Sequence, residues 1–152
     1  MQKFPIKLLK GLTNQEQLEF VRKWFKENFI CDSNKNKICF KTHDYKRVIF
    51  SDILYNHVYT KEDSLTGQRE IDYTRLRHIH LIEETLKLRN NPLFKDGIDE
   101  EHGDFRRCYL DPKRNYFIVL KRIRGGNFQF ISAYFMQSAK ERKKKNKFMR
   151  NP

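Results

Sequence analysis

The clearest strand pattern in the chain lies in FRRCYLDPKRNYFIVLKRIRGGNFQFISAYFM, residues 105–136. Three runs rich in aromatic and β-branched residues, FRRCYL, YFIVLKRI and FQFISAYFM, are separated by the turn-forming segments DPKRN and RGGN. Gly125 and Gly126 can adopt the positive φ angles that tight hairpin turns require, so they predict a two-residue turn. The stretch therefore predicts an antiparallel meander of at least three strands.

The turn also predicts which side chains share a face of the sheet, because alternate residues of a strand point to opposite sides. A two-residue turn pairs Arg124 with Asn127. On one face, which we expect to pack on helices, the pairs are Leu120 with Ile131, Ile118 with Ala133, and Tyr116 with Phe135. On the second face the pairs are Lys121 with Phe130, Val119 with Ser132, and Phe117 with Tyr134.

The first strand of the meander places an arginine on this second face. A four-residue DPKR loop sets Arg106 opposite Val119, in the same row as Ser132. A bulge at the Pro112 turn would present Arg107 there instead. Cationic groups beside hydroxyl and aromatic groups suit a phosphate and a stacked base.

The residues before the meander read mainly as helices. Helical spacing of apolar residues predicts helices over residues 15–28, from Ser51 through residue 63, and over 71–92 with the stripe Leu76, Ile79, Ile82 and Leu86. KICFK and RVIFS predict a short hairpin, and residues 94–104 predict an acidic loop. Helices first and strands last predict an α+β fold, with N-terminal helices packed on a C-terminal antiparallel sheet. We expect one domain over residues 1–137 and a basic tail over 138–152.

The charge of the chain predicts a polyanionic partner. The net charge is +13, and the last fifteen residues hold seven basic side chains and one acidic, so the rest still carries +7. Such an excess favours nucleic acid, and a tail containing Lys143, Lys144 and Lys145 adds salt-sensitive, nonspecific affinity. Arg75, His78, Arg122 and Arg124 are further nucleic-acid-binding candidates.

The compartment is expected to be the cytoplasm. Lys7 and Lys10 interrupt the apolar N-terminus, so it does not read as a secretory signal, and no run of about 18 apolar residues predicts a membrane span. The three cysteines show no CxxC spacing, which indicates reduced thiols rather than a zinc cluster. We expect no metal, no cofactor and no membrane partner.

The order of motifs resembles the phage- and mobile-element-associated nucleases of the barnase, colicin and RelE-like superfamily. A helix with a histidine, ILYNHVY, precedes HIHLIEETLKLRNNP, and then come an arginine-bearing strand, a hydrophobic strand and a strand ending in Ser-Ala-Tyr. Ile82, Thr85 and Leu86 match the family's I-x-x-T-L, and Ser132, Ala133 and Tyr134 match its T-A-Y with serine for threonine. The resemblance covers residues 48–140. Pro92 falls later than in the family, and the insertion at 60–72 leaves the family's histidine open between His57, His78 and His80.

The resemblance implies a metal-independent endoribonuclease of the toxin type. RNA would be cleaved by attack of its 2′-OH on the neighbouring phosphate, leaving a 2′,3′-cyclic phosphate. His57 would be the base or acid, Arg106 or Arg107 the strand cation, Ser132 the phosphate-orienting hydroxyl, and Tyr134 a stacking or core residue. Lys121 joins these catalytic candidates through its predicted place on the second face. An acidic inhibitor or immunity protein is an expected partner.

Two other functions remain open on sequence. The scaffold could be a non-catalytic nucleic-acid-binding module, or a basic protein-interaction domain. A histidine on an apolar helical face is often structural, and Ser132 and Tyr134 could satisfy each other inside a core.

Overall fold

The structure of the chain is a computed structural model that describes residues 4–51, 59–87, 93–98 and 103–143. Its helical elements are α1 (Ile6–Leu9), α2 (Asn14–Phe25), the π-helical turn η1 (Lys26–Ile30), α4 (Tyr73–Arg77), α5 (Leu81–Lys87) and the short η2 (Arg124–Gly126). Its strands are β1 (Phe40–Lys41), β2 (Arg47–Ile49), β3 (Thr60–Glu62), β4 (Arg69–Ile71), β5 (Leu93–Ile98), β6 (Phe105–Asp111), β7 (Tyr116–Arg122) and β8 (Phe128–Phe135).

The predicted α+β class is confirmed. Six strands form one sheet in the order β1-β2-β8-β7-β6-β5, and β3 and β4 form a separate hairpin. The strands β5 to β8 are an antiparallel meander, whereas β2 lies parallel to β8. The whole sheet is therefore mixed, and the expectation of a purely antiparallel sheet holds only for the meander.

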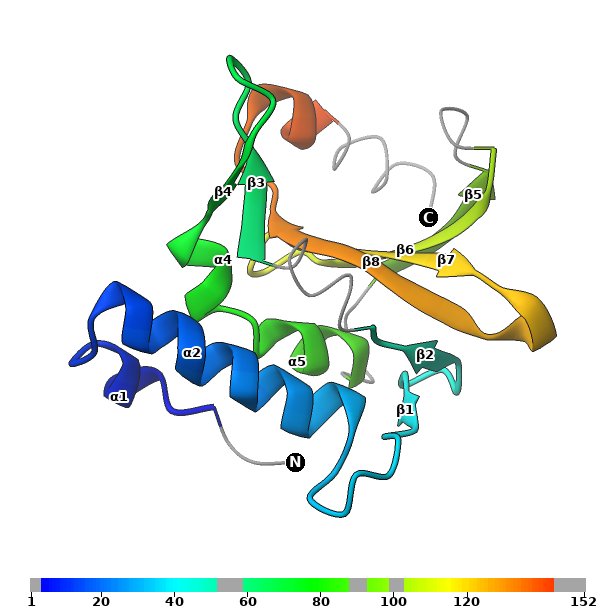
Figure 1. Ribbon diagram of the computed structural model, residues 1–152. Coiled ribbons are helices and arrows are strands. Elements are labelled where there is room, and N and C mark those ends of the chain that lie inside the picture. The colour runs from blue at the N-terminus through cyan, green and yellow to red at the C-terminus, as the bar shows by residue number, and fades with distance from the viewer. Residues whose placement is uncertain (1–3, 52–58, 88–92, 99–102, 144–152) are drawn as a thin grey trace.

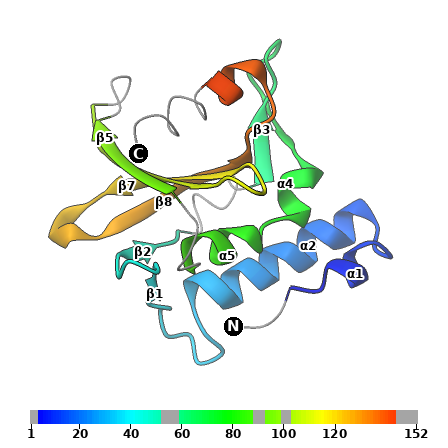
Figure 2. The ribbon, with the colours of Figure 1, turned by 180° about the vertical axis from the view of Figure 1, so that it is seen from behind.

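Helices α2 and α5 lie on one side of the sheet, while the β3–β4 hairpin rises from the other side (Figures 1 and 2). We call the covered side the helix face; it carries Tyr109, Ile118, Leu120, Phe130 and Ala133, all buried in the main core. We call the opposite side the far face. It carries Cys108, Phe117, Val119, Ser132 and Tyr134.

Helix α2 begins with a capping box. The Thr13 hydroxyl accepts a hydrogen bond from the Glu16 amide, and the Glu16 carboxylate accepts one from the Thr13 amide, each at 3.2 Å. The helix predicted over residues 15–28 is thus confirmed as α2 continued by η1. Trp24 and Phe29 are buried, and the Phe29 ring lies 5.7 Å from that of Phe40 in β1, which brings this segment against the sheet.

A bulge in β8 corrects the predicted register. The pairs Tyr116–Phe135, Phe117–Tyr134, Ile118–Ala133 and Val119–Ser132 form as expected. Beyond them Leu120 lies opposite Phe130 and Lys121 opposite Gln129, so the predicted pairs Leu120–Ile131 and Lys121–Phe130 are wrong. The extra residue is Ile131, and the turn holds three residues because Ile123, rather than Arg124, bonds to Asn127.

The bulge moves two large rings into the core. In an uninterrupted strand Phe128 and Phe130 would share a face with Ser132 and Tyr134. The shift of one residue turns both to the helix face, where they are buried. Ile131 instead packs with the far-face residues Leu110, Phe117, Val119 and Met136.

Three further expectations about secondary structure are wrong. The helix predicted over 71–92 is interrupted at residues 78–80, although its stripe Leu76, Ile79, Ile82 and Leu86 is fully buried. Residues 60–62, expected to end a helix from Ser51, form strand β3, and residues 52–58 of that prediction lie outside the described residues. The acidic loop predicted from residue 94 begins instead as part of edge strand β5.

Candidate nucleic-acid interface

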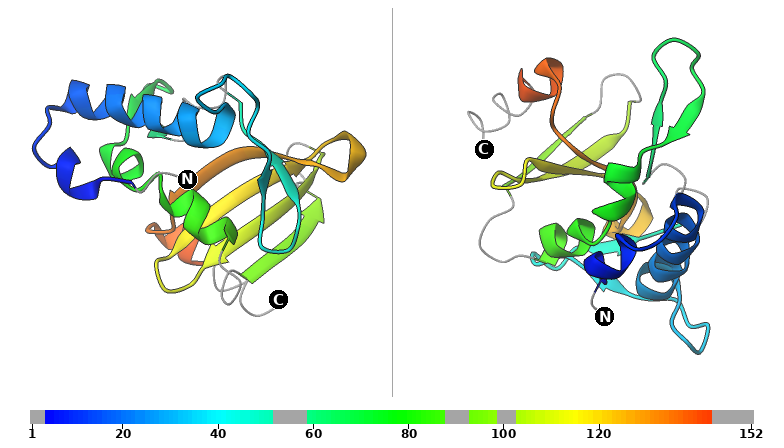
Figure 3. Two further views of the ribbon diagram at one scale, coloured as in Figure 1. Left: turned by 90° about the horizontal axis from the view of Figure 1, so that it is seen from below. Right: turned by 90° about the vertical axis from the view of Figure 1, so that its left-hand side faces the viewer.

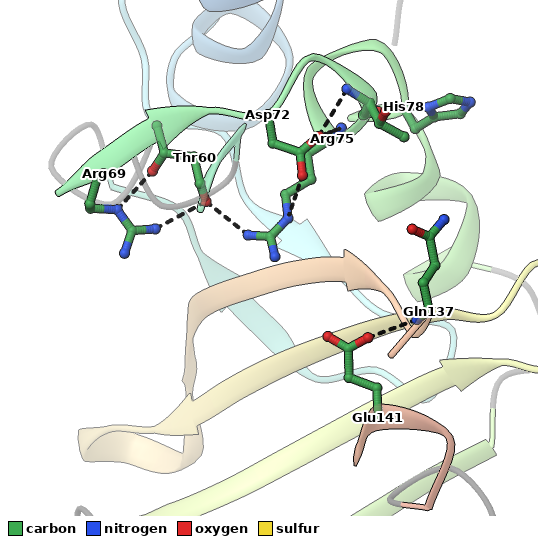
Figure 4. Close-up of polar contacts among 8 residues, drawn as sticks. Thr60, Arg69, Asp72, Arg75, His78, Gln137 and Glu141 are labelled. Carbon is green, nitrogen blue, oxygen red and sulfur yellow. Dashed lines mark hydrogen bonds and ion pairs between the residues drawn. The ribbon is translucent and has the colours of Figure 1, made fainter. Parts of the chain in front are cut away.

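A cluster of arginines lies where helix α4 and the β3–β4 hairpin meet the end of β8. Asp72 caps α4, since its Oδ1 accepts from the Thr74 and Arg75 amides at 3.0 and 3.2 Å. This cap fixes the start of α4, and Figure 4 shows the Arg75 side chain extending from it toward Thr60. The helix begins here because the aspartate before YTRL is a preferred N-cap residue.

Thr60 gathers two arginines. Arg75 donates from a terminal nitrogen to the Thr60 carbonyl oxygen at 2.8 Å, and Arg69 donates to the same oxygen at 3.0 Å (Figure 4). Arg69 Nε also donates to the Thr60 hydroxyl at 2.8 Å, and Arg75 Nε lies 3.6 Å from Asp72 Oδ2. Asp72 is the carboxylate that contacts Arg75, and Glu62 lies directly opposite Arg69 across the hairpin.

The cluster meets the far face of the sheet at Tyr134. The guanidinium carbon of Arg75 lies 5.5 Å from the centre of the Tyr134 ring, which is the range of a cation–π contact. Ser132 occupies the same face two residues earlier, opposite Val119. Both are half-buried. The sequence predicts Ser132 and Tyr134 on one face of the sheet and gives Arg75 as a separate binding candidate, and the fold brings Arg75 against Tyr134.

The tail begins on the same side of the sheet. Residues 139–143 are helical, and Ser138 and Glu141 cap them reciprocally, since Glu141 Oε2 accepts from the Ser138 amide at 2.8 Å and Ser138 Oγ accepts from the Glu141 amide at 3.1 Å. Glu141 Oε2 also accepts from the Gln137 amide at 2.7 Å (Figure 4). Figure 3 shows this turn and the β3–β4 hairpin rising from one side of the sheet. Lys143 is exposed here, and Lys144 and Lys145 lie outside the described residues.

His78 does not join the arginine cluster. Its ring lies 5.1 Å from the ring of Phe135, which pairs with the core residue Tyr116. Its Nδ1 is 2.7 Å from the Thr74 carbonyl, which can only accept, so Nδ1 carries the proton. Figure 4 shows the imidazole directed away from Arg75. His57 lies outside the described residues; in the sequence it precedes Thr60 by three positions.

Arg106 and Lys121 share the far face, but at the other end of the meander. They lie directly opposite each other, so the expected pairing of Arg106 with Val119 is wrong. Asp104 contacts both, at 2.7 Å from Arg106 Nε and 3.7 Å from Lys121 Nζ. Leu110 and Phe117 lie in the same row as Tyr134, and the row between them and the Arg106–Lys121 pair holds Cys108, Val119 and Ser132. Arg106 and Lys121 are therefore one row away from Ser132 and two rows away from Tyr134.

Arg107 lies on the helix face, separate from Ser132 and Tyr134. Its guanidinium group is 3.1 Å from both Asp44 and Asp96. Burial raises the pKa of Asp44, but hydrogen bonds from Thr42 and Tyr109 and the charge of Arg107 outweigh it, so the pKa lies below its ordinary value. Burial and the negative charge of Asp44 raise the pKa of Tyr109, which keeps its hydroxyl a donor to Asp44.

Sequence reasoning missed Arg69, Thr60 and Asp72. An N-cap pattern at Asp72 was available and would have located α4. The β3–β4 hairpin offered no comparable signal, because TKE and REI hold one strongly apolar residue between them. Arg122 and Arg124, proposed as nucleic-acid-binding residues, lie at the exposed β7–β8 turn instead.

Comparison with known proteins does not assign the chain to a family. No protein-family model matches the sequence, and searches of curated proteins and of solved structures found no significant match. Within the described ranges, no group of three or more His, Cys, Asp or Glu side chains is arranged to hold a metal ion. None of the described helices has the length and apolar character needed to cross a membrane.

Proposed function

We propose that the chain binds single-stranded RNA at Arg69, Arg75 and Tyr134 and cleaves it without a metal ion. The observation that carries the proposal is the position of the Arg75 guanidinium, 5.5 Å over the Tyr134 ring and on the face that bears Ser132. A cation, an aromatic ring and a hydroxyl at one strand end are the groups that a phosphate, a base and a ribose require.

Binding follows from the charge and shape of these groups. The net charge of +13 attracts a polyanion over long range. Arg69 and Arg75 present planar guanidinium groups that match two phosphate oxygens at a time. A base can stack on a tyrosine ring whatever its identity, so recognition is tolerant of sequence and favours unpaired strands.

Cleavage needs groups that move protons and stabilise charge. Attack of a 2′-OH on the adjacent phosphate requires a base, an acid for the leaving 5′ oxygen, and cations for the phosphoryl oxygens. Arg69 and Arg75 are the proposed cations, and Ser132 the proposed orienting hydroxyl. His57 is the proposed base or acid, because an imidazole can accept or donate a proton near neutral pH. In the sequence it precedes Thr60, which binds both arginines, by three residues.

A non-catalytic RNA-binding module is the second candidate. The histidines in the described ranges are held on the helix side: His43 contacts the Leu86 carbonyl at 3.2 Å, His78 lies beside Phe135, and His80 stacks on Phe4 at 4.8 Å. That placement favours binding without turnover if His57 takes no part. In both cases we propose a cytoplasmic protein, and an acidic inhibitor whose charge complements the basic surface.

The deciding experiment incubates the purified protein with end-labelled single-stranded RNA in EDTA. Products ending in a 2′,3′-cyclic phosphate, absent with folded His57→Ala protein prepared in parallel, support the nuclease. Retention of labelled RNA without products supports the binding module. The absence of both RNA binding and RNA cleavage would contradict both proposals.

A further inference from the structure

A second basic site lies on the helix face, at the end of the meander away from Tyr134. A pocket of about 210 Å³ opens there between the β1–β2 turn, β5, β6 and the tip of the β7–β8 hairpin. The side chains that line it are those of Lys46, Asp96, Phe105, Arg107, Arg122 and Phe128. Three of these six side chains are cations and one is an acid.

Two of the cations, Arg107 and Arg122, contact aromatic rings. The guanidinium carbon of Arg107 lies 5.7 Å from the Phe128 ring centre, and that of Arg122 lies 5.2 Å from the Phe105 ring centre. Ring contacts of this kind hold a guanidinium plane in place while its N–H groups stay directed at an acceptor. The pocket therefore offers oriented donors rather than loose surface charge.

Arg107 is the buried member, with 7% of its side chain exposed. A buried charge requires opposite charges nearby, and carboxylate oxygens of Asp44 and Asp96 each lie 3.1 Å from the guanidinium group. Asp44 is locked in place, because it accepts from the Thr42 hydroxyl at 2.6 Å and the Tyr109 hydroxyl at 3.0 Å. Asp96 is different: it lies on edge strand β5, its side chain is 42% exposed, and its Oδ1 lies 3.1 Å from Arg107 Nε.

We propose that this pocket binds a phosphate monoester, whose oxygens replace the Asp96 carboxylate on Arg107. Lys46 and Arg122 supply the remaining positive charge, and Asp44 keeps the guanidinium oriented throughout. Pockets that enclose whole small molecules usually measure about 300–1,000 Å³. The volume here fits the phosphate group, so the rest of the ligand extends outward along the exposed side.

This site is independent of the proposed RNA cleavage. Arg107 and Tyr134 lie on opposite faces of the sheet, and the two clusters share no residue. The phosphate can come from a free nucleoside 5′-monophosphate or from the 5′-phosphorylated end of an RNA strand. Both sources present the same terminal phosphate, and the experiment separates them.

The test is calorimetric titration of the full chain with inorganic phosphate, adenosine 5′-monophosphate and adenosine. We expect both phosphates to bind and adenosine not to bind. Arg122→Gln and Lys46→Gln, which change partly exposed side chains, each weaken phosphate binding on the order of tenfold. Asp96→Asn strengthens it, because the competing carboxylate loses its charge. Lys10→Gln on the exposed end of α1 is the charge control and leaves binding unchanged.

A short RNA with and without a 5′-phosphate forms the second arm. Tighter binding of the phosphorylated RNA, lost in Arg122→Gln but kept in Tyr134→Leu, assigns the RNA end as the source. Equal binding of the two RNAs with retained monophosphate binding assigns the free nucleotide. Weaker phosphate binding in Asp96→Asn, equal affinity for adenosine and its monophosphate, or no phosphate binding at all overturns the proposal.

Discussion

The Arg75 guanidinium carbon lies 5.5 Å from the ring centre of Tyr134, joining a five-residue helix to the last strand of the sheet. Each partner is also held by further contacts, Arg75 by Asp72 and by Thr60 of β3, and Tyr134 by the ring of Phe117 of β7 at 5.7 Å. The pair is thus positioned before any ligand arrives. A pre-positioned site loses less conformational entropy on binding than one that must be ordered.

Removing the charge of Arg75 should change how RNA affinity responds to salt. If Arg75 contacts one phosphate, Arg75→Gln lowers the slope of log affinity against log salt by about 0.7, the value for one contact on a single strand. Fluorescence anisotropy with labelled RNA over a range of salt concentrations measures the slope. The matched control is Arg77→Gln, which removes a cation 5.8 Å from the Tyr73 ring in the same helix. Equal slopes for wild type and Arg75→Gln would remove Arg75 from the interface.

His80 should make the protein sensitive to mild acid. Burial lowers its pKa below the ordinary value, a tendency that nearby Glu84 opposes and that His78 and Arg114 reinforce. The unfolded chain therefore binds a proton at His80 more readily than the folded chain, so stability falls as pH drops through the unfolded pKa of about 6.5. Urea denaturation at pH 7.5 and 5.5 should show this loss, and His80→Phe should reduce it. An undiminished loss in His80→Phe would assign the sensitivity to another group.

Asp44 should also make stability fall with decreasing pH, but in a more acidic range than His80. Its folded pKa is lowered, so its contribution to stability is complete above the unfolded pKa of about 3.9 and is lost as pH falls through the folded value. Asp44→Asn should lower stability at pH 7 and flatten the fall between about pH 5 and pH 3. Thermal unfolding of both proteins across this range checks the slope. Parallel curves would contradict the assigned ionisation.

Phe29 should be among the residues that the fold tolerates losing least. It is 1% exposed, and its ring lies 4.7 Å from that of Phe50 and 5.7 Å from that of Phe40. Phe29→Ala should cost about 3–5 kcal/mol of unfolding free energy, since a cavity opens between α2 and the sheet. Phe29→Leu fills more of the space and should cost less. Chemical denaturation measures both, and equal costs would mean that the aromatic cluster repacks freely.

The meander could be predicted because its strands are long, apolar and punctuated by Gly125 and Gly126, whose φ angles of 76° and 72° match the requirement for glycine. The bulge at Ile131 could not, because it is decided by the burial of Phe128 and Phe130 against the helices rather than by local pattern. The helix break at residues 78–80 was equally hidden. The apolar stripe runs through it without interruption, from Leu76 and Ile79 to Ile82.

The candidate site likewise has a part that could be predicted from the sequence and a part that could not. Register predicted Ser132, Tyr134, Lys121 and either Arg106 or Arg107 on one face, and the structure has Arg106 there. The approach of Arg75 to Tyr134 joins a helix and a strand with no local signal between them. It depends on the N-cap residue Asp72 and on Thr60, and Thr60 lies in a hairpin that the sequence pattern does not reveal.

Cleavage at the Arg75–Tyr134 site is tested by the rate at which 2′,3′-cyclic phosphate ends form on single-stranded RNA in EDTA, compared between Tyr134→Leu, its control Tyr73→Leu and the wild type. Loss of one stacked base should slow formation on the order of tenfold in Tyr134→Leu. Tyr73→Leu, which removes the other ring paired with an α4 arginine, should keep the wild-type rate. Equal rates for folded Tyr134→Leu and wild type, or no cyclic phosphate from the wild type, would contradict cleavage at the Arg75–Tyr134 site.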